Sequence, residues 1–175
     1  MLLSKRTVTW IVRILVLLAF VAGVLVLWDY RLEKNNVALE FVLHGNPSEA
    51  ELVGFLDSGY EILVSNTLTT LEHRKLAGGR EKAANLLTSR NGSIWYGAAL
   101  YLGSLGDQRS VPYLIRGLNH PAWRSRHRVV SYLQTLTGQN YGERKEEWIN
   151  WWSAQSKAGG FDFTCVTTQQ FTQPR

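Results

Sequence analysis

Cysteine is nearly absent from this chain of 175 residues, because Cys165 is the only one. A single cysteine cannot form a disulfide within the chain, and it cannot supply a cysteine-rich metal site. We interpret Cys165 as an inert thiol in the C-terminal tail. The four histidines are scattered, and the chain has neither a glycine-rich phosphate loop nor a nucleophile elbow. The sequence therefore predicts a protein that is not an enzyme and holds no cofactor or metal.

Long alternations of apolar and polar residues, the usual mark of half-buried strands, are also lacking after residue 36. Apolar residues make up 45% of the chain, which is enough for a packed core. They recur instead at helical spacing, as in Val111, Leu114, Ile115 and Leu118. The predicted fold class is therefore all-α.

One long apolar run is present at residues 8–28, which read VTWIVRILVLLAFVAGVLVLW with Arg13 as the single charge. A helix of this length crosses a hydrocarbon layer of about 30 Å at ~1.5 Å per residue. Trp10 and Trp28 lie at its two ends, where aromatic rings favour the membrane interface. A cleaved signal peptide is the alternative, but its apolar run is normally about 7–15 residues. We therefore predict a single transmembrane helix, Val8 to Trp28, after a short flank at residues 1–7.

The charges that flank this run set the expected orientation. Lys5, Arg6 and Arg13 lie on the N-terminal side, and Arg31 and Lys34 follow. The positive-inside rule then places the N-terminus in the cytoplasm and the main domain on the extracytoplasmic side. Residues 29–47 are predicted as a juxtamembrane linker with a separate helix over 37–44.

An internal repeat follows the linker. In the first helices of three successive units, equivalent positions lie 31 residues apart: Leu52, Ala83 and Leu114, then Leu56, Leu87 and Leu118. In the second helices, the equivalent positions step by 34 and then 31 residues: Val64, Ala98 and Val129. Periodicity of this length predicts a stack of helical hairpins, each of which buries its apolar stripe on its neighbours.

Helix-end signals agree with these units. Ser48 and Glu51 have the spacing of a capping box at the first helix. Asn119 is predicted to cap a helix that begins near His120. Gly138 has the position of a left-handed cap at the end of a leucine-rich helix.

The stretch LYLGSLGDQRSVPYLIRGLNHPAWRSRHRVVSYLQTLTGQ resembles a HEAT repeat of the bacterial, phycobilisome-lyase-like type. Its Leu-Gly-x-Leu-Gly-Asp turn contains Asp107, and Arg126 corresponds to the arginine that precedes the helix leucine in such repeats. The resemblance covers residues 98–138 and weakens toward residues 48–71. It implies a short right-handed α-solenoid of about three hairpins within 48–155 that binds other proteins. It also implies structural roles for Asp107 and Arg126.

Three tryptophans lie close to the end of this region. Trp148, Trp151 and Trp152 are at i, i+3 and i+4, so they share one face of a helix. Because large rings at helical spacing usually face a core, we predict a capping helix near 143–155 that covers the last hairpin. Residues 156–175 show no helical stripe and are predicted to be a tail.

The segment between Gln108 and Gly142 is basic. It contains no acidic residue and five arginines: Arg109, Arg116, Arg124, Arg126 and Arg128. An unbalanced group of this kind attracts an acidic partner. Trp123 lies within it, and tryptophan with arginine is frequent in interface hot spots. The predicted partner-binding residues are Arg116, Trp123, Arg124 and Arg128.

These features predict a membrane-anchored adaptor that binds a protein partner without catalysis. Lipid head groups are an alternative ligand of the basic segment, and nucleic acid is not expected because no nucleic-acid module is present. The alternative function is a HEAT-like lyase or an enzyme subunit that binds a chromophore or a metal.

Overall fold

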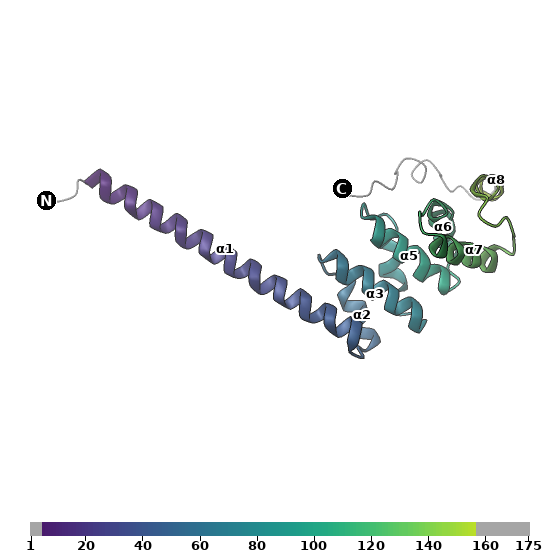
Figure 1. Cartoon of the computed structure of the whole chain (residues 1–175), viewed down its shortest axis with the longest axis horizontal. Helices are drawn as coiled ribbons and strands as arrows, with labels where there is room; N and C mark the ends of the chain where they lie inside the picture. Colours follow the sequence, from purple (N-terminus) through teal and green to yellow (C-terminus); the bar gives the residue numbers. More distant parts are fainter. Residues whose placement is uncertain (1–4, 157–175) are drawn as a thin grey trace.

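The computed structural model describes residues 5–156, apart from the side chains of residues 5–9, 11, 12, 123 and 156. Secondary structure in this range is entirely helical, which confirms the predicted class. Cys165 and most of the predicted tail lie outside the described residues. A long helix, α1 (Lys5–His44), leads to a group of shorter helices on one side of its C-terminal end (Figure 1).

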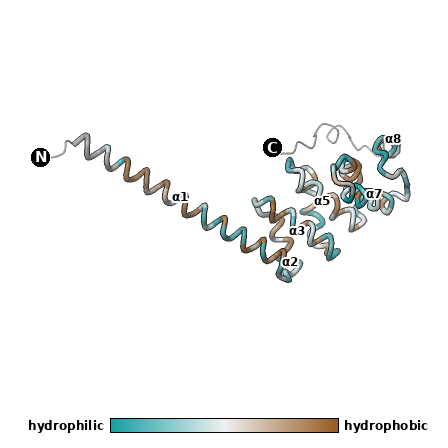
Figure 2. The backbone as a smooth tube through the Cα atoms, in the orientation of Figure 1, coloured by the Kyte–Doolittle hydropathy of each residue, from teal (hydrophilic) through white to brown (hydrophobic). Residues whose placement is uncertain are grey.

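Helix α1 contains the apolar run and continues well beyond it. Figure 2 shows apolar colouring along the middle of α1, followed by a polar stretch and a second apolar stretch before His44. The helix is long and apolar enough to cross a membrane. The predicted break before residue 37 is wrong, because α1 is one uninterrupted helix of 40 residues. Arg31, Leu32, Glu33 and Lys34 are all good helix formers, so the polar stretch does not end the helix.

The remaining helices form three pairs and one final helix. The pairs are α2 (Glu49–Phe55) with α3 (Glu61–Arg74), α4 (Arg80–Leu86) with α5 (Gly92–Ser104), and α6 (Val111–Gly117) with α7 (Trp123–Thr137). A short 3₁₀ helix, η1 (Gln108–Ser110), precedes α6, and α8 (Lys145–Ser156) follows α7. Helix α5 is central, since it packs on α3 and α7 as well as on α4 and α6.

The positions that align at 31-residue spacing in the sequence belong to the core. Leu52, Ala83 and Leu114 are each 0% exposed. Their partners one turn later, and the first stripe residues of the second helices, are also buried: Leu56, Leu87, Leu118, Val64, Ala98 and Val129. The aligned positions of all three pairs are therefore buried. Gly103 allows α7 to approach α5 closely, because a Cβ at this position would lie 3.3 Å from the Cβ of Tyr132.

Two of the three helix-end predictions are confirmed. Ser48 and Glu51 form the full capping box of α2, and Gly138 caps α7 with φ of 71°. The Asn119 cap is wrong, because α7 begins later, at Trp123, and Ala122 is its N-cap residue.

Helix α8 packs on α6, and Trp148 is its buried anchor at 0% exposure. The indole nitrogen of Trp148 donates to the carbonyl oxygen of Gly142 at 2.8 Å, and Tyr141 contacts its ring edge-on. Trp151 and Trp152 are only half-buried, and Trp151 meets Trp148 edge-on. The shared tryptophan face therefore lies partly against the core and partly in solvent.

Candidate functional site

A groove of about 890 Å³ lies between α3, α5 and the start of α7. Helix α3 contributes one wall, α5 forms the floor, and the loop before α7 forms the other wall. Its lining combines apolar surface with small polar side chains, and the latter offer hydrogen-bond donors and acceptors to a ligand. The lining residues are Ser65, Thr69, Glu72, Asn91, Gly92, Ser93, Tyr96, Gly97, Leu100, Asn119, His120, Pro121 and Arg128.

The groove is bridged by a polar contact between its two walls. Arg128 of α7 donates to Glu72 of α3, and the hydroxyl of Tyr132 donates to the same carboxylate oxygen at 2.6 Å. The Glu72 side chain is 5% exposed, whereas that of Arg128 is 43% exposed. Burial and the bond to Glu72 raise the pKa of Tyr132 to about 12. The bridge ties the first helical pair to the third, and it neutralises a carboxylate that burial would otherwise destabilise.

At the far wall, His120 stacks on Tyr96 with ring centroids 4.9 Å apart. Burial, and secondarily the nearby charge of Arg126, lower the pKa of His120, so the ring is neutral near pH 7. The Tyr96 hydroxyl donates to the carbonyl oxygen of Ser125 at 3.1 Å and so joins α5 to the start of α7. This part of the groove is aromatic and uncharged, whereas the bridge between Glu72 and Arg128 is charged.

The predicted partner-binding residues do not form one surface. Arg128 lines the groove, but its guanidinium is engaged with Glu72. Arg124 is exposed on the first turn of α7. Trp123 is the first residue of α7, and its side chain lies outside the described residues.

Arg116 corrects the sequence expectation, because it is 8% exposed and lies inside the fold. Its guanidinium carbon is 4.0 Å from the centroid of the Trp95 ring, a cation–π contact between α6 and α5. Burial lowers the pKa of Arg116. Arg116 therefore contributes to packing and presents no charge to a partner.

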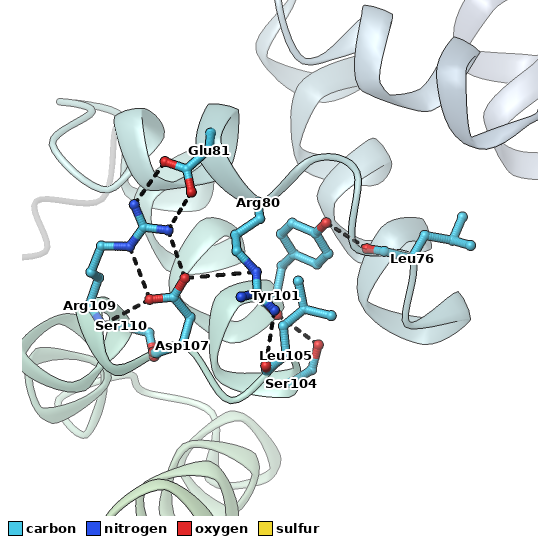
Figure 3. A network of polar contacts seen from close by, with 9 residues as sticks. All are labelled: Leu76, Arg80, Glu81, Tyr101, Ser104, Leu105, Asp107, Arg109 and Ser110. Atoms are coloured by element: carbon cyan, nitrogen blue, oxygen red, sulfur yellow. Dashed lines mark hydrogen bonds and ion pairs between the residues drawn. The ribbon is translucent and has the colours of Figure 1, made fainter.

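Asp107 and Arg126 both make contacts that join separate segments. Asp107 caps η1 by accepting from the backbone nitrogen of Arg109, and its carboxylate also binds the Arg109 side chain (Figure 3). Arg109 reaches both carboxylate oxygens of Glu81 on α4, so this network ties the loop after α5 to the preceding pair. The hydrogen bonds from Arg109 lower the pKa of Asp107.

Arg126 closes the turn before α7 and reaches the segment before α8. Its guanidinium donates to the carbonyl oxygens of His120 and Pro121 and to the carboxylate of Glu143 at 2.7 Å. These contacts join the turn before α7 to the segment that leads to α8.

Glu72 and Tyr132 are the groove residues that sequence reasoning missed. Glu72 is a single acidic residue on an otherwise apolar stripe, and its partners lie 56 and 60 residues away. This separation along the chain leaves no local sequence signal that would pair Glu72 with Arg128 or Tyr132. Among the described residues, no group of three or more potential metal ligands converges.

Comparisons of the chain with models of protein families, with curated proteins and with solved structures found no match.

Proposed function

We propose that this chain is a single-span membrane protein whose three helical pairs form a short right-handed α-solenoid of HEAT-like hairpins. In this proposal it acts as a non-catalytic adaptor, and a protein partner binds in the groove between α3, α5 and α7. The matched burial of Leu52, Ala83 and Leu114 supports the repeat, since each occupies the same place in its own pair.

The groove is the observation that carries the adaptor function. Its walls come from all three pairs, and its lining is rich in serine, threonine and asparagine. Such side chains satisfy the backbone groups of an extended polypeptide, which must keep hydrogen-bond partners when it leaves water. Arg124 is exposed three residues after Pro121, which lines the groove, and its charge favours an acidic segment.

The long helix supplies the anchor. Its apolar run continues into the part of α1 that packs on α3, so every copy of the groove is held at the membrane. The balance of lysine and arginine across the run favours an extracytoplasmic domain.

Photocrosslinking in intact membranes tests this function. A photoreactive residue at Ser93, which lines the groove, should capture one defined protein band. The same residue at the exposed Asn85 on α4, outside the groove, should not. Arg124→Glu should weaken the capture several-fold. Arg124 is preferred to Arg128 because reversal at Arg128 would also break the bridge to Glu72.

Equal capture at Ser93 and Asn85 would contradict a groove ligand, and full capture by Arg124→Glu would contradict an acidic one. A purified domain that carries stoichiometric metal or visible colour would favour the lyase-like or enzyme-subunit alternative instead.

A further inference from the structure

Two contacts define how the helical domain lies along α1. The side chain of Arg74, at the end of α3, donates to the carbonyl oxygen of Pro47 at 2.6 Å, just after α1 ends. At the other end of α3, a Cβ on Gly59 would lie 3.5 Å from Nη2 of Arg31. Helix α3 therefore runs parallel to α1, with its start at the level of Arg31 and its end at the level of Pro47.

The helix lengths agree with this alignment. From Arg31 to His44 on α1, and from Glu61 to Arg74 on α3, each helix advances 13 residues. Both intervals correspond to about 20 Å at ~1.5 Å per residue. The two helices thus remain in register over the whole contact, and Val42 of α1 is buried in it.

This register places the start of α3 close to the apolar run. Arg31 follows Trp28, the last residue of the run, by three residues, a rise of about 5 Å. The head-group layer on each side of the hydrocarbon is about 5–8 Å thick. If residues 8–28 span the bilayer, the turn before α3 lies at the head groups and not at a distance from the membrane.

The starts of α5 and α7 lie beside the start of α3. Asn91 donates to the carboxylate of Glu61 at 2.6 Å, which joins the N-terminal ends of α5 and α3. The hydroxyl of Tyr96 reaches the carbonyl oxygen of Ser125 and joins α5 to the first turn of α7. The three turns at residues 57–60, 87–91 and 118–122 therefore share one edge of the domain, here named the turn edge. Figure 1 shows the helical domain to one side of the C-terminal end of α1. Because α3 runs parallel to α1, the turn edge points toward the N-terminal end of α1.

The side chains at the turn edge suit a membrane interface. Among the described side chains after α1, Ile62 is the one large apolar side chain that is exposed, at 52%. It borders a small pocket of about 190 Å³ between the starts of α3 and α5. Arg90 and Arg124 are exposed on the second turn and just after the third.

The acidic groups on the same edge already have partners. Asp57 is paired with Lys82, and Glu61 accepts from Asn91. The charge of Asp57 is therefore offset by Lys82. Arginine side chains at a bilayer surface favour lipid phosphates.

We propose that the turn edge rests on the head-group layer of the membrane that α1 crosses, with Ile62 in the interface and Arg90 and Arg124 at lipid phosphates. The ligand is the lipid surface itself, because α1 brings the turn edge to that surface in every molecule. The proposal rests on the transmembrane assignment of α1 in the proposed function. It shares Arg124 with the proposed acidic partner, whereas the interfacial position of Ile62 does not depend on the groove or its partner.

Depth-dependent fluorescence quenching tests this arrangement in the full chain. With Cys165→Ser as background, an environment-sensitive label is attached at Ile62→Cys or, as the matched control, at His73→Cys. His73 is exposed near the opposite end of the same helix. The protein is reconstituted in phosphatidylcholine–phosphatidylglycerol vesicles that contain lipids spin-labelled near the head group. Quenching at position 62 should exceed quenching at position 73 several-fold, and equal quenching at the two positions would overturn the proposal.

Flotation of the same vesicles distinguishes failure of the transmembrane assignment of α1 from failure of the contact between the turn edge and the head groups. Protein that does not float with the lipid would disprove the transmembrane assignment and this proposal together. Protein that floats but shows no excess quenching at position 62 would disprove the proposal alone.

Charge reversal tests the arginines separately. Arg90→Glu combined with Arg124→Glu should reduce quenching at position 62 in anionic vesicles at least twofold. Lys75→Glu, at the far end of α3, should leave it unchanged. Unchanged quenching in the double variant would overturn the contact with lipid phosphates.

Discussion

Arg128 on α7 donates to Glu72 on α3 across the groove, although α5 lies between the two helices. With Tyr132 on the same carboxylate, this contact joins the first and third helical pairs. The buried carboxylate of Glu72 depends on this contact for its hydrogen bonds, whereas the half-exposed guanidinium of Arg128 can also be solvated by water.

Replacement of Glu72 should therefore cost more stability than the loss of a surface ion pair. Glu72→Leu leaves Arg128 and the Tyr132 hydroxyl without their acceptor, and we expect the free energy of unfolding to fall by about 1–3 kcal/mol. Urea unfolding of the domain measures the change. Asp57→Asn is the matched control, because its pair with Lys82 is exposed and should change stability by less than about 1 kcal/mol. Equal losses of unfolding free energy in the two variants would show that the bridge across the groove stabilises the domain no more than an exposed ion pair does.

Asp107 should make the domain sensitive to acid. The hydrogen bonds from Arg109 lower the pKa of Asp107 in the folded state below its ordinary value of 3.8. A lowered carboxylate pKa means that the stabilisation is fully present above the unfolded pKa and is lost as the pH falls through the folded pKa. Asp107→Asn should thus be less stable than the parent by about 1–3 kcal/mol near neutral pH. The difference should shrink once the pH falls below about 4.

Unfolding curves over a pH series measure this difference, and Glu81→Gln is the control. Glu81 binds the same arginine, but its side chain is 77% exposed, so its replacement should have a smaller effect. A gap between Asp107→Asn and the parent that is constant with pH would contradict the assigned protonation change.

Trp148 should be the most sensitive position of α8. Trp148→Ala removes a fully buried ring and its bond to Gly142, and we expect a loss of about 3–5 kcal/mol in the free energy of unfolding. Trp151→Ala should cost clearly less, because that ring is half-buried. Thermal unfolding compares the two. Because α8 does not line the groove, the folded fraction of Trp148→Ala should still be crosslinked at Ser93.

Thr67 offers a substitution that should stabilise the domain. It is 0% exposed on α3, and its hydroxyl has no hydrogen-bond partner among the described residues. Thr67→Val keeps the shape and removes the unsatisfied hydroxyl, so the unfolding free energy should rise by about 1 kcal/mol. Thr70→Val is the control, since the Thr70 hydroxyl donates to the carbonyl oxygen of Asn66 at 3.0 Å. A loss of stability in Thr67→Val would mean that the hydroxyl is satisfied.

Periodicity predicted the core well, because the apolar stripe of a helix is buried whichever helix packs against it. The stripes that begin at Leu52, Val64 and Val129 are buried as their spacing predicts. Spacing says nothing about which distant helix lies opposite a given polar residue. Arg116 was therefore counted with an exposed basic surface, whereas it lies over Trp95 of the preceding pair.

The same limit explains the groove. Its charged bridge needs two helices that are not consecutive, and no local pattern around Glu72 indicates Arg128. The continuity of α1 was missed for a different reason. The polar residues after Tyr30 interrupt the apolar pattern, although they retain high helix propensity.

Because α1 is uninterrupted, the rotation of the helical domain about the α1 axis is fixed relative to the apolar run. An α-helix turns by about 100° and rises ~1.5 Å at each residue. The number of residues between Trp28 and Val42 therefore sets how far the domain lies from the apolar run and in which direction around the α1 axis its groove faces. If α1 spans a membrane, as we propose, one inserted residue would rotate the groove by more than a quarter of a circle about the membrane normal and change its height by only ~1.5 Å. An insertion or deletion in this part of α1 would therefore turn the groove toward a different neighbour in the plane of that membrane, without a change in any residue that lines the groove.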